Sequence, residues 1–421
     1  MEENTEKEFS KSFAEMSSND WMVGDFHIHS RFSRACSKNI DIPTLVKWAK
    51  VKGLNILGTS DFTHPVWLGE IKKLLVSNGK GLYFYEDFPF ILSGEISLIY
   101  TQGRGRRVHL LVLAPNLEIV DEINSFLDSR GRRDYDGRPI FKISCEDFVK
   151  EMKKISLDIE VIPAHIWTPW FGVFGSKSGF DSLKEAFGEQ FENINAIETG
   201  ISSDPPMNWK IKELNEKSIV SFSDSHSFWP WRLGREATIF QKTDSYLEII
   251  KQIRENSFLG TIETDPGYGI YHYDGHRNCN FSCAPEKTKE LNGICPVCKR
   301  TLTLGVDYRV LELASNPENF KPAGAKFFYK ILPLHEVIAL FLQNGIQAKK
   351  TWEIYNSLIK LFENEFNVLL NVSKDDFIKV GINNLLIELI LKNREGKIKV
   401  KPGYDGVYGK TVLGEKQVTL G

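Results

Sequence analysis

Short apolar runs alternate with longer amphipathic stretches from Trp21 to about Asp265. Two of these stretches, Ile42–Val51 and Cys145–Ile155, space their apolar residues as a helix does. Strands that alternate with helices favour parallel βα units, and so many units predict a barrel or a doubly wound sheet. The seven strand-like runs are Met22–Phe26, Asn55–Thr59, Phe90–Ser93, Val108–Leu113, Glu160–Ala164, Asn195–Ile197 and Ile219–Phe222.

The character of the chain changes after the last of these units. A glycine- and tyrosine-rich passage, Pro266–Gly275, precedes a cluster of cysteines, and helical spacing returns in Leu334–Gln343 and Trp352–Phe362. We therefore predict four parts. They are a polar N-terminal tail (1–20), an α/β barrel (21–265), a small cysteine module (266–325) and a helical C-terminal domain that ends in an irregular tail (326–421).

The composition is that of an ordinary globular protein. Of the 421 residues 42% are hydrophobic and 26% are charged, and 53 basic against 55 acidic side chains leave a formal charge of −2. This balance excludes a highly basic coating protein. No apolar run approaches the ~18 residues that a membrane span needs. The first residues are polar and lack the apolar core of a signal peptide, so we expect a cytoplasmic protein.

Histidines and carboxylates recur at the ends of the predicted strands. The carboxyl ends of parallel barrel strands surround one mouth, so side chains at those ends converge there. His109 opens its run instead, and it joins the others only if its strand is antiparallel or the barrel is distorted. The candidates are His27, His29, Asp61, His64, Glu95, His109, His165, Asp224 and His226.

This mixture of side chains predicts a metal site with more than one ion. A single histidine at a strand end is more often structural, but recurrence at successive strands argues against that interpretation. Nitrogen ligands mixed with carboxylates suit zinc, manganese or iron, and one carboxylate can bridge two ions. Paired ions activate water and stabilise an in-line phosphoryl displacement.

Four of the six cysteines lie within twenty residues. In a reducing compartment such a cluster indicates metal ligation rather than disulfides. Cys279 and Cys283 form one pair, Cys295 and Cys298 form another, and two such pairs are what a tetrahedral structural Zn²⁺ requires. His272 and His276, just upstream, are spare ligand candidates.

Arginine-rich and aromatic segments lie beside the predicted mouth. QGRGRRVH and DSRGRRDYDGR are by default solvated faces, and aromatic residues are by default core. Next to a metal site, arginines could instead hold phosphates and aromatic rings could stack on bases. A phosphatase of small metabolites has little use for such a surface. The DNA-binding candidates are Trp167, Trp170, Phe171, Lys177, Arg232 and Arg235.

Residues 21–265 resemble the PHP (polymerase and histidinol phosphatase) metallophosphoesterases. The resemblance is carried by HIH, the acidic SD near the second strand, SGE, the isolated His109 and His165, and the final SDSH. It implies a distorted (β/α)7 barrel with up to three ions at its mouth. Phe62 stands where many members have a histidine. The implied ligand sets are His27, His29, Glu95 and Asp224 for one ion, Glu95, His109 and His165 for a second, and His64 and His226 with Asp61 for a third.

Nearly the whole chain from Trp21 resembles one family in particular, endonuclease Q. The barrel is followed by NCNFSC and CPVC and then by LPLHEVIALFL and KPGYDGVYG, and HIWTPWFGVFGSKSGF and PWRLGREAT are further distinctive strings. The resemblance implies a DNA endonuclease that cuts 5′ of deoxyuridine, deoxyinosine, deoxyxanthosine and abasic sites and leaves a 3′-hydroxyl and a 5′-phosphate. Base flipping and metal-hydroxide attack are implied, with Asp224, His226 and Glu95 as catalytic residues.

The same resemblance implies cofactors and partners. We expect one structural Zn²⁺ on the four cysteines and two or three divalent ions (Zn²⁺, Mn²⁺ or Mg²⁺) in the barrel. Lesion-containing DNA is the expected partner. Archaeal relatives end in a sliding-clamp motif, whereas Gln417–Gly421 has the opening glutamine but no paired aromatic residues. The alternatives are another PHP phosphoesterase, either a 3′–5′ exonuclease or a histidinol-phosphate-like phosphatase, and a non-catalytic nucleic-acid-binding module.

Overall fold

The computed structural model describes residues 20–412. The predicted N-terminal tail, apart from Asp20, and the Gln417–Gly421 segment considered for clamp binding lie outside the described residues. Between residues 20 and 412, no helix has the length and apolar content needed to span a bilayer.

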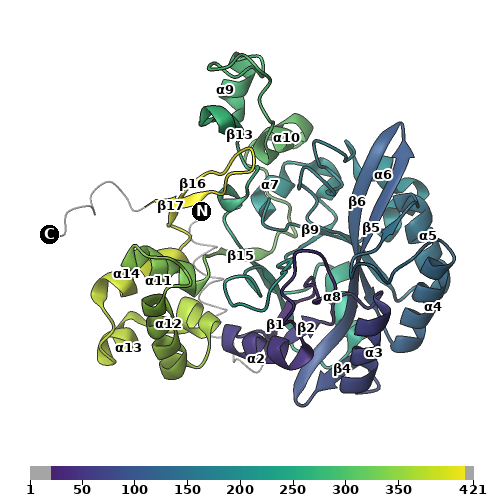
Figure 1. Ribbon diagram of the computed structural model, residues 1–421, viewed down its shortest axis with the longest axis horizontal. Helices are drawn as coiled ribbons and strands as arrows, with labels where there is room; N and C mark the ends of the chain where they lie inside the picture. The colour runs from purple at the N-terminus through teal and green to yellow at the C-terminus, as the bar shows by residue number, and fades with distance from the viewer. Residues whose placement is uncertain (1–19, 413–421) are drawn as a thin grey trace.

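Seven strands form a distorted barrel at the centre of the molecule (Figure 1). Parallel pairing joins β1 to β2, β2 to β5 and β9 to β10, while β6 runs antiparallel to both β5 and β8. Strand β8 lies beside β9, and a parallel bridge from Ile28 to Ser225 brings the end of β10 back to β1. The strands are β1 (Trp21–Asp25), β2 (Ile56–Gly58), β5 (Phe88–Gln102), β6 (Arg104–Ala114), β8 (Glu160–Pro163), β9 (Ala196–Glu198) and β10 (Ser218–Val220).

The predicted fold class is confirmed, and each of the seven predicted runs corresponds to one barrel strand. The largest difference is the hairpin of β5 and β6, which is far longer than its two predicted runs. The first arginine-rich segment is therefore no loop, because Arg104–Ala114 form a strand paired along its whole length with Phe88–Gln102. Strand β6 is also antiparallel, which is one of the two alternatives that the position of His109 left open.

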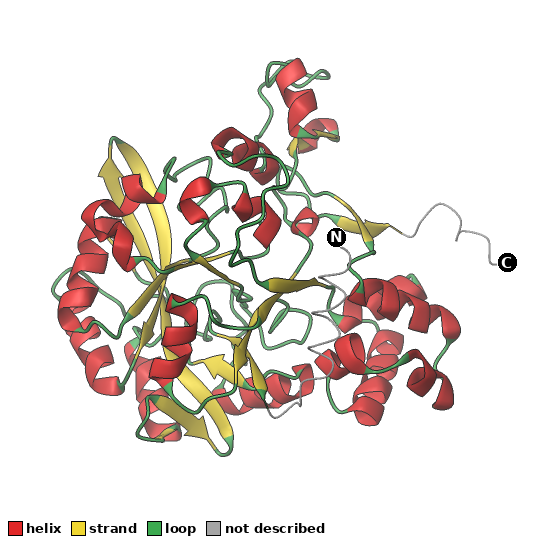
Figure 2. Ribbon diagram, turned by 180° about the vertical axis from the view of Figure 1, so that it is seen from behind, coloured by secondary structure: helices red, strands yellow, loops and turns green. Residues whose placement is uncertain are grey.

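Helices cover the outside of the barrel, and their ends follow from local sequence (Figure 2). Helix α2 (Ile42–Lys52) begins where the Asp41 side chain accepts a hydrogen bond from the Thr44 N–H, and it ends at Gly53, whose φ of 98° favours glycine. Helix α5 (Cys145–Ile155) is capped by Ser144 and buries one apolar stripe. The other covering helices are α3 (Pro65–Leu74), α4 (Leu117–Asp128) and α8 (Tyr246–Arg254).

Several strands of the main sheet were not predicted. Strand β11 (Ala237–Gln241) pairs antiparallel with β1 and with β12 (Gly260–Glu263). Strand β15 (Phe327–Lys330) continues this edge by pairing in parallel with β12. The main sheet therefore includes a strand beyond residue 265, and the boundaries proposed for the four parts stay predictions. Shorter strands are β3 (Val76–Ser77), β4 (Leu82–Tyr85) and β7 (Ile140–Phe141).

The cysteine module and the C-terminal helices occupy separate places around the barrel (Figure 1). The tail predicted to be irregular contains a two-stranded hairpin, β16 with β17. The module consists of β13 (Asp274–His276), β14 (Phe281–Cys283) and α9 (Pro285–Glu290), followed by α10 (Val306–Leu313). The C-terminal elements are α11 (Leu334–Leu342), α12 (Lys349–Phe362), α13 (Lys374–Lys379), α14 (Asn384–Arg394), β16 (Lys399–Lys401) and β17 (Lys410–Val412).

One buried ion pair joins the C-terminal helices to the barrel. The Lys52 ammonium at the end of α2 lies 2.6 Å from Glu365 Oε1, and both side chains are at most 1% exposed. Lys52 also donates to the carbonyl of Pro230, in the loop that carries Arg232 and Arg235. Trp352 of α12 packs on the same loop, with its ring centre 5.6 Å from that of Trp231.

We expect Lys52→Met to lower the free energy of unfolding by roughly 3–5 kcal/mol, because it leaves the Glu365 carboxylate buried without its partner. The urea midpoint measured by circular dichroism checks this. Lys50→Met, which breaks the exposed pair of Lys50 with Asp87, is the matched control and should leave the midpoint unchanged. Equal midpoints for both variants would contradict the role given to the buried pair.

Candidate metal centre

The register of the β5–β6 hairpin places two of the predicted ligands together. Glu95 pairs with Leu111 and Ser97 pairs with His109, so Glu95 and His109 are diagonal neighbours on one face of the hairpin. His109 Nδ1 lies 2.7 Å from Glu95 Oε1. The antiparallel direction of β6 therefore brings a residue at the start of its predicted run to the same place as residues at the ends of other strands.

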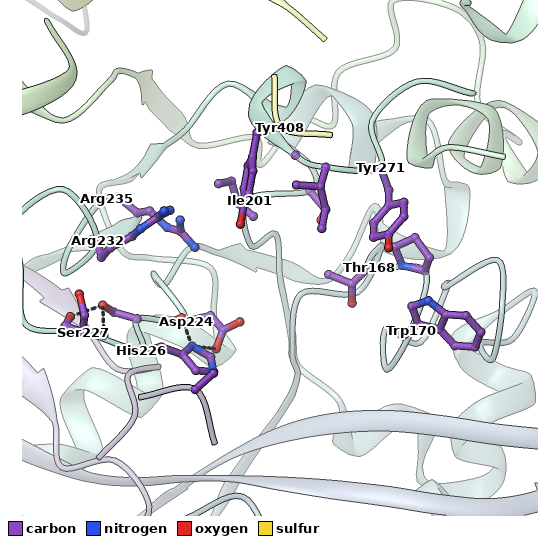
Figure 3. A pocket seen from close by; sticks show the side chains of 16 residues that line it. Thr168, Trp170, Ile201, Asp224, His226, Ser227, Arg232, Arg235, Tyr271 and Tyr408 are labelled. Carbon is purple, nitrogen blue, oxygen red and sulfur yellow. Dashed lines mark hydrogen bonds and ion pairs between the residues drawn. The ribbon is translucent and has the colours of Figure 1, made fainter. Parts of the chain in front are cut away.

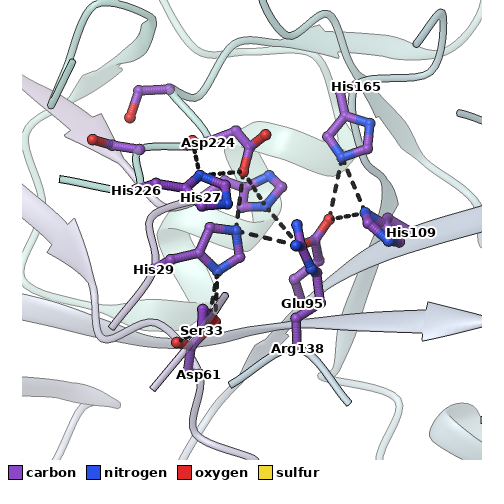
Figure 4. A network of polar contacts seen from close by, with 12 residues as sticks. His27, His29, Ser33, Asp61, Glu95, His109, Arg138, His165, Asp224 and His226 are labelled. Carbon is purple, nitrogen blue, oxygen red and sulfur yellow. Dashed lines mark hydrogen bonds and ion pairs between the residues drawn. The ribbon is translucent and has the colours of Figure 1, made fainter. Parts of the chain in front are cut away.

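Glu95 lies at the centre of the site, and its two oxygens face two different sets of side chains (Figure 4). Oε2 lies 3.3 Å from His29 Nε2 and 3.5 Å from His27 Nε2. Oε1 faces His109 and lies 3.2 Å from His165 Nε2. The arrangement is that of a carboxylate able to bridge two ions.

Two groups of side chains hold their donor atoms close enough to share a metal ion. Within each group, one ligand atom from every residue lies within 4.8 Å of all the others. Glu95 belongs to both groups. The groups are His27, His29, Glu95 and Asp224, and Glu95, His109 and His165.

The donor atoms themselves fit a cation. His27 Nε2 is buried and has no hydrogen-bond partner, although it points into the first group. Burial lowers the pKa of His109 to about 4, so this imidazole is neutral, the form that binds a metal. Burial alone would raise the pKa of Glu95, but the positive charges of Arg138 and His27 outweigh it and hold that pKa well below its usual value.

Two further carboxylates orient the histidines from behind. Glu198 accepts from His27 Nδ1 at 2.9 Å and from the backbone N–H of His165 at 2.7 Å. Asp61 Oδ1 lies 3.1 Å from His29 Nδ1. A carboxylate behind a metal-binding histidine fixes its tautomer and the direction of its free nitrogen. Asp61 is thus an orienting residue in this structure rather than a member of either group.

Backbone strain is concentrated at the same strand ends. Asp61, His165 and Asp224 have φ angles of 33°, 32° and 48°, in the left-handed region that non-glycine residues rarely adopt. Such conformations cost about 1–3 kcal/mol each and persist where the surrounding structure holds them, often at functional sites.

The structure does not gather a third set from the remaining histidines. The His64 ring stacks on Phe32, with ring centres 4.2 Å apart, and within residues 20–412 it joins neither group. His226 lies at the mouth, where its Nδ1 is 3.0 Å from the Asp224 carbonyl oxygen and its ring centre is 4.5 Å from that of His29. A third ion held by His64 and His226 together finds no support in this geometry.

A cavity of about 540 Å³ opens beside Asp224 and His226 (Figure 3). Arg232 and Arg235 reach it from the loop after β10, and Trp170 reaches it from the loop after β8. Tyr271 and Tyr408 come from the passage before the cysteine module and from the C-terminal hairpin, so no pattern near the histidine motifs could predict them. Of the other predicted aromatic residues, Trp167 is buried, with an exposed fraction of 1%. Phe171 packs on the ring of His109.

Sequence reasoning also missed Glu198 and the position of Arg138. Glu198 directly follows the sixth predicted run, and an acidic residue at a strand end was the signal that could have identified it. Arg138 lies in the second arginine-rich loop, and its guanidinium is 3.2 Å from Glu95 Oε2. Nothing local distinguishes this arginine from its exposed neighbours.

The cysteine module holds a separate group of possible metal ligands. His276, Cys279, Cys295 and Cys298 have donor atoms within 4.8 Å of one another. Cys283 is not in this group, and its Sγ lies 3.3 Å from Thr288 Oγ1.

The fold and sequence are similar to those of known proteins. A lesion-specific endonuclease from Pyrococcus furiosus, PfuEndoQ, is 31% identical, with a TM-score of 0.85 over 94% of this chain and 96% of that one. The chain belongs to the endonuclease Q family. Another structure of the family, a complex of endonuclease Q with a 27-mer duplex carrying an abasic lesion at the active site, matches with a TM-score of 0.83 and 31% identity over 94% of this chain and 97% of that one.

The chain is also similar to proteins known from sequence. Residues 333–397 match the family model of the MJ0043 C-terminal domain. The uncharacterized protein MJ0043 of Methanocaldococcus jannaschii is 31% identical over 289 residues, which are 66% of this chain but only 34% of that protein. The chain thus spans about a third of that relative. The uncharacterized protein YqxK of Bacillus subtilis is 26% identical over 92% of this chain and 98% of its own length.

We expect Glu198→Gln to weaken divalent-ion binding in the barrel by about 10–100-fold, because the His27 ring loses the carboxylate that orients it. Mn²⁺ titration followed by electron paramagnetic resonance of the free ion measures this. The exposed Glu192→Gln is the control and should bind as the parent protein does. Unchanged affinity in Glu198→Gln would show that His27 needs no orienting partner.

Proposed function

We propose that the chain is a lesion-specific DNA endonuclease that hydrolyses the phosphodiester 5′ of deoxyuridine, deoxyinosine, deoxyxanthosine and abasic sites. The products carry a 3′-hydroxyl and a 5′-phosphate. The observation that supports this most strongly is the position of the Glu95 site, which lies directly beside a cavity of about 540 Å³. Pockets of roughly 300–1,000 Å³ accommodate small organic groups, and a flipped nucleotide base is of this kind.

The residues that would hold the ions are those of the two groups around Glu95, and their nitrogen and carboxylate donors suit Zn²⁺ or Mn²⁺. Bound there, two ions would lower the pKa of a water molecule and neutralise charge on the leaving oxygen. Asp224 is the one member of the first group with substantial exposure, at 29% of its side chain, and it lines the cavity. It therefore lies at the boundary between the ligand groups and the space for substrate.

The chain's own cationic groups would bind the substrate. Arg232 and Arg235 face the cavity, and Arg235 Nε is buried without a hydrogen-bond partner within the described chain. A guanidinium only donates hydrogen bonds, so it fits a phosphate oxygen or a base carbonyl and is a poor match for an exocyclic amine. Deamination replaces such an amine by a carbonyl, which gives this cavity a physical basis for preferring deaminated bases.

Aromatic side chains would stabilise the unstacked nucleotide. Trp170 is 45% exposed at the rim, and Tyr271 and Tyr408 line the cavity (Figure 3). Stacking on such rings contributes about 1–3 kcal/mol per base and tolerates any base, including the neighbours of an abasic site. Phe171 contacts His109 instead and supports the metal site from behind.

The test is a nicking assay on end-labelled duplexes that carry one uracil, hypoxanthine, xanthine or abasic site, with an undamaged duplex beside them. We expect a single cut 5′ of each lesion and none in the undamaged strand. Chelation should abolish the cut, and Glu95→Gln should slow it by more than about 100-fold, because both ligand groups lose their shared carboxylate. The exposed Glu122→Gln is the control.

Other products would identify other functions. Laddering from the 3′ end of every duplex would indicate an exonuclease. Hydrolysis of a small phosphomonoester with no cleavage of any duplex would indicate a phosphatase, and either result would overturn the proposed endonuclease.

A further inference from the structure

The cysteine module contains two turns of the same length that end in left-handed residues. His276 and Cys279 enclose two residues, as do Cys295 and Cys298, and fifteen residues (280–294) separate the two pairs. Two x2 pairs separated by fifteen to twenty residues are the spacing of a zinc knuckle module. Cys279 and Cys283, by contrast, enclose three residues.

The residues that follow the two turns also share a backbone conformation. Asn280 follows Cys279 with a φ of 48°, and Lys299 follows Cys298 with a φ of 63°. Both are non-glycine residues in a conformation that such residues seldom adopt. The two turns therefore have matching shapes, and the position equivalent to Cys295 is occupied by His276.

Side-chain positions agree with the turns. His276 Nδ1 lies 3.1 Å from Cys279 Sγ and 3.4 Å from Cys298 Sγ. Cys283 lies opposite Asp274 in the β13–β14 ladder, whereas His276 lies opposite Phe281. Cys283 is thus displaced by two residues, roughly 7 Å along the strand, from the ladder position of His276.

We infer that the structural zinc of this module is held by three thiolates and one imidazole, from Cys279, Cys295, Cys298 and His276, and that Cys283 is not a ligand. A Cys₃His set is a common closed tetrahedral site, and its metal complex carries one negative charge less than a four-thiolate site. The sequence prediction of four cysteine ligands is replaced in this proposal by a set that uses the upstream histidine.

Cobalt substitution distinguishes the two sets, because only thiolate ligands give intense sulfur-to-cobalt charge-transfer absorption and the barrel groups contain no cysteine. We expect Cys283→Ser to keep the charge-transfer band and the Co²⁺ affinity of the parent chain. His276→Ala should lose at least about 10-fold in affinity, and His276→Cys should restore binding with a stronger band. Loss of the band in Cys283→Ser, with normal binding in His276→Ala, would overturn the proposal.

A measurement on the unaltered chain covers the case of a variant that does not fold. Alkylation of the zinc-loaded protein, followed by peptide mass spectrometry, should modify Cys283 while Cys279, Cys295 and Cys298 remain protected. Protection of all four cysteines, lost together on chelation, would show that Cys283 binds the metal.

A second inference concerns a hollow of about 420 Å³ at the β5–β6 hairpin, which we name the basic hollow. Trp170 lines both this hollow and the cavity beside Asp224, so the two spaces meet at one exposed ring. The lining residues are Ile99, Tyr100, Thr101, Gly105, Arg106, Arg107, Lys142, Trp170, Lys177 and Ser178, and none is acidic.

Three cations in the basic hollow are available to a ligand. Arg107, Lys142 and Lys177 are exposed, and in the described part of the chain none of them forms an ion pair. Arg106 differs, because it is buried and paired with Glu185 at 2.7 Å. The Arg107 guanidinium lies 5.6 Å from the centre of the Trp170 ring, which lines both spaces.

The geometry points to the basic hollow as a binding site for backbone phosphates of the strand that flanks the lesion. This inference rests on the proposed function, since it assumes that a nucleic-acid strand occupies the neighbouring cavity. Each phosphate neutralised by a cation contributes about 0.9 to the slope of log affinity against log salt concentration for duplex DNA.

Lys142→Ala combined with Lys177→Ala tests the hollow. In the Glu95→Gln background, we expect lesion-duplex affinity to fall about 10-fold or more and the salt slope to fall by about 1–2. Lys154→Ala, at an exposed lysine of α5, is the control. An affinity and a salt slope equal to those of the control would overturn phosphate binding in the basic hollow. A parent chain that binds DNA but nicks no lesion would overturn only the proposed function.

Discussion

A buried carboxylate must be paired with positive charge or it destabilises the fold, and Glu95 is the place where this constraint acts on the whole barrel. Its side chain is fully buried, with four histidines and Arg138 around it. These partners come from the segment after β1, from within β6, from the segment after β8 and from a loop. The barrel strands must therefore be in register for the charge to be compensated. Divalent ions between Glu95 and the histidines would satisfy the same requirement more completely, since they would also occupy the free nitrogen of His27.

The supporting structure positions both the ligands and the walls of the site. Glu198 and Asp61 set the direction of two histidine rings, and left-handed backbone at Asp61, His165 and Asp224 turns the strand ends inward. The loop with Arg232 and Arg235, which line the cavity, is held by Lys52 and by aromatic rings of the C-terminal helices. The helical region thus contributes to the site without containing a ligand.

Sequence patterns predicted much of this site because strand ends are local features. The HIH and SDSH motifs, Glu95 and His165 all follow apolar runs that form strands. His109 could be included only on the condition that its strand was antiparallel or the barrel was distorted. Side chains that reach the site from distant parts of the sequence could not be predicted from strand ends. Tyr271 and Tyr408 reach the cavity through segments distant in sequence, and Arg138 resembles the other arginines of its loop. His64 was grouped with the ligands because it follows the second predicted strand, but its ring stacks on Phe32.

The cysteine module illustrates a different limit. Counting cysteines gives four ligands, whereas turn length and backbone conformation favour a histidine in place of Cys283. Residue type alone could not distinguish these sets, because the choice depends on which side chains a pair of equivalent turns brings together.

The most direct measurement on the centre is anomalous X-ray diffraction from crystals of the chain soaked in Mn²⁺. We expect two separate peaks in the barrel, one beside His27, His29 and Asp224 and one beside His109 and His165, with the Glu95 carboxylate between them. A single peak, or two peaks that do not both contact Glu95, would contradict a shared carboxylate as the basis of this site.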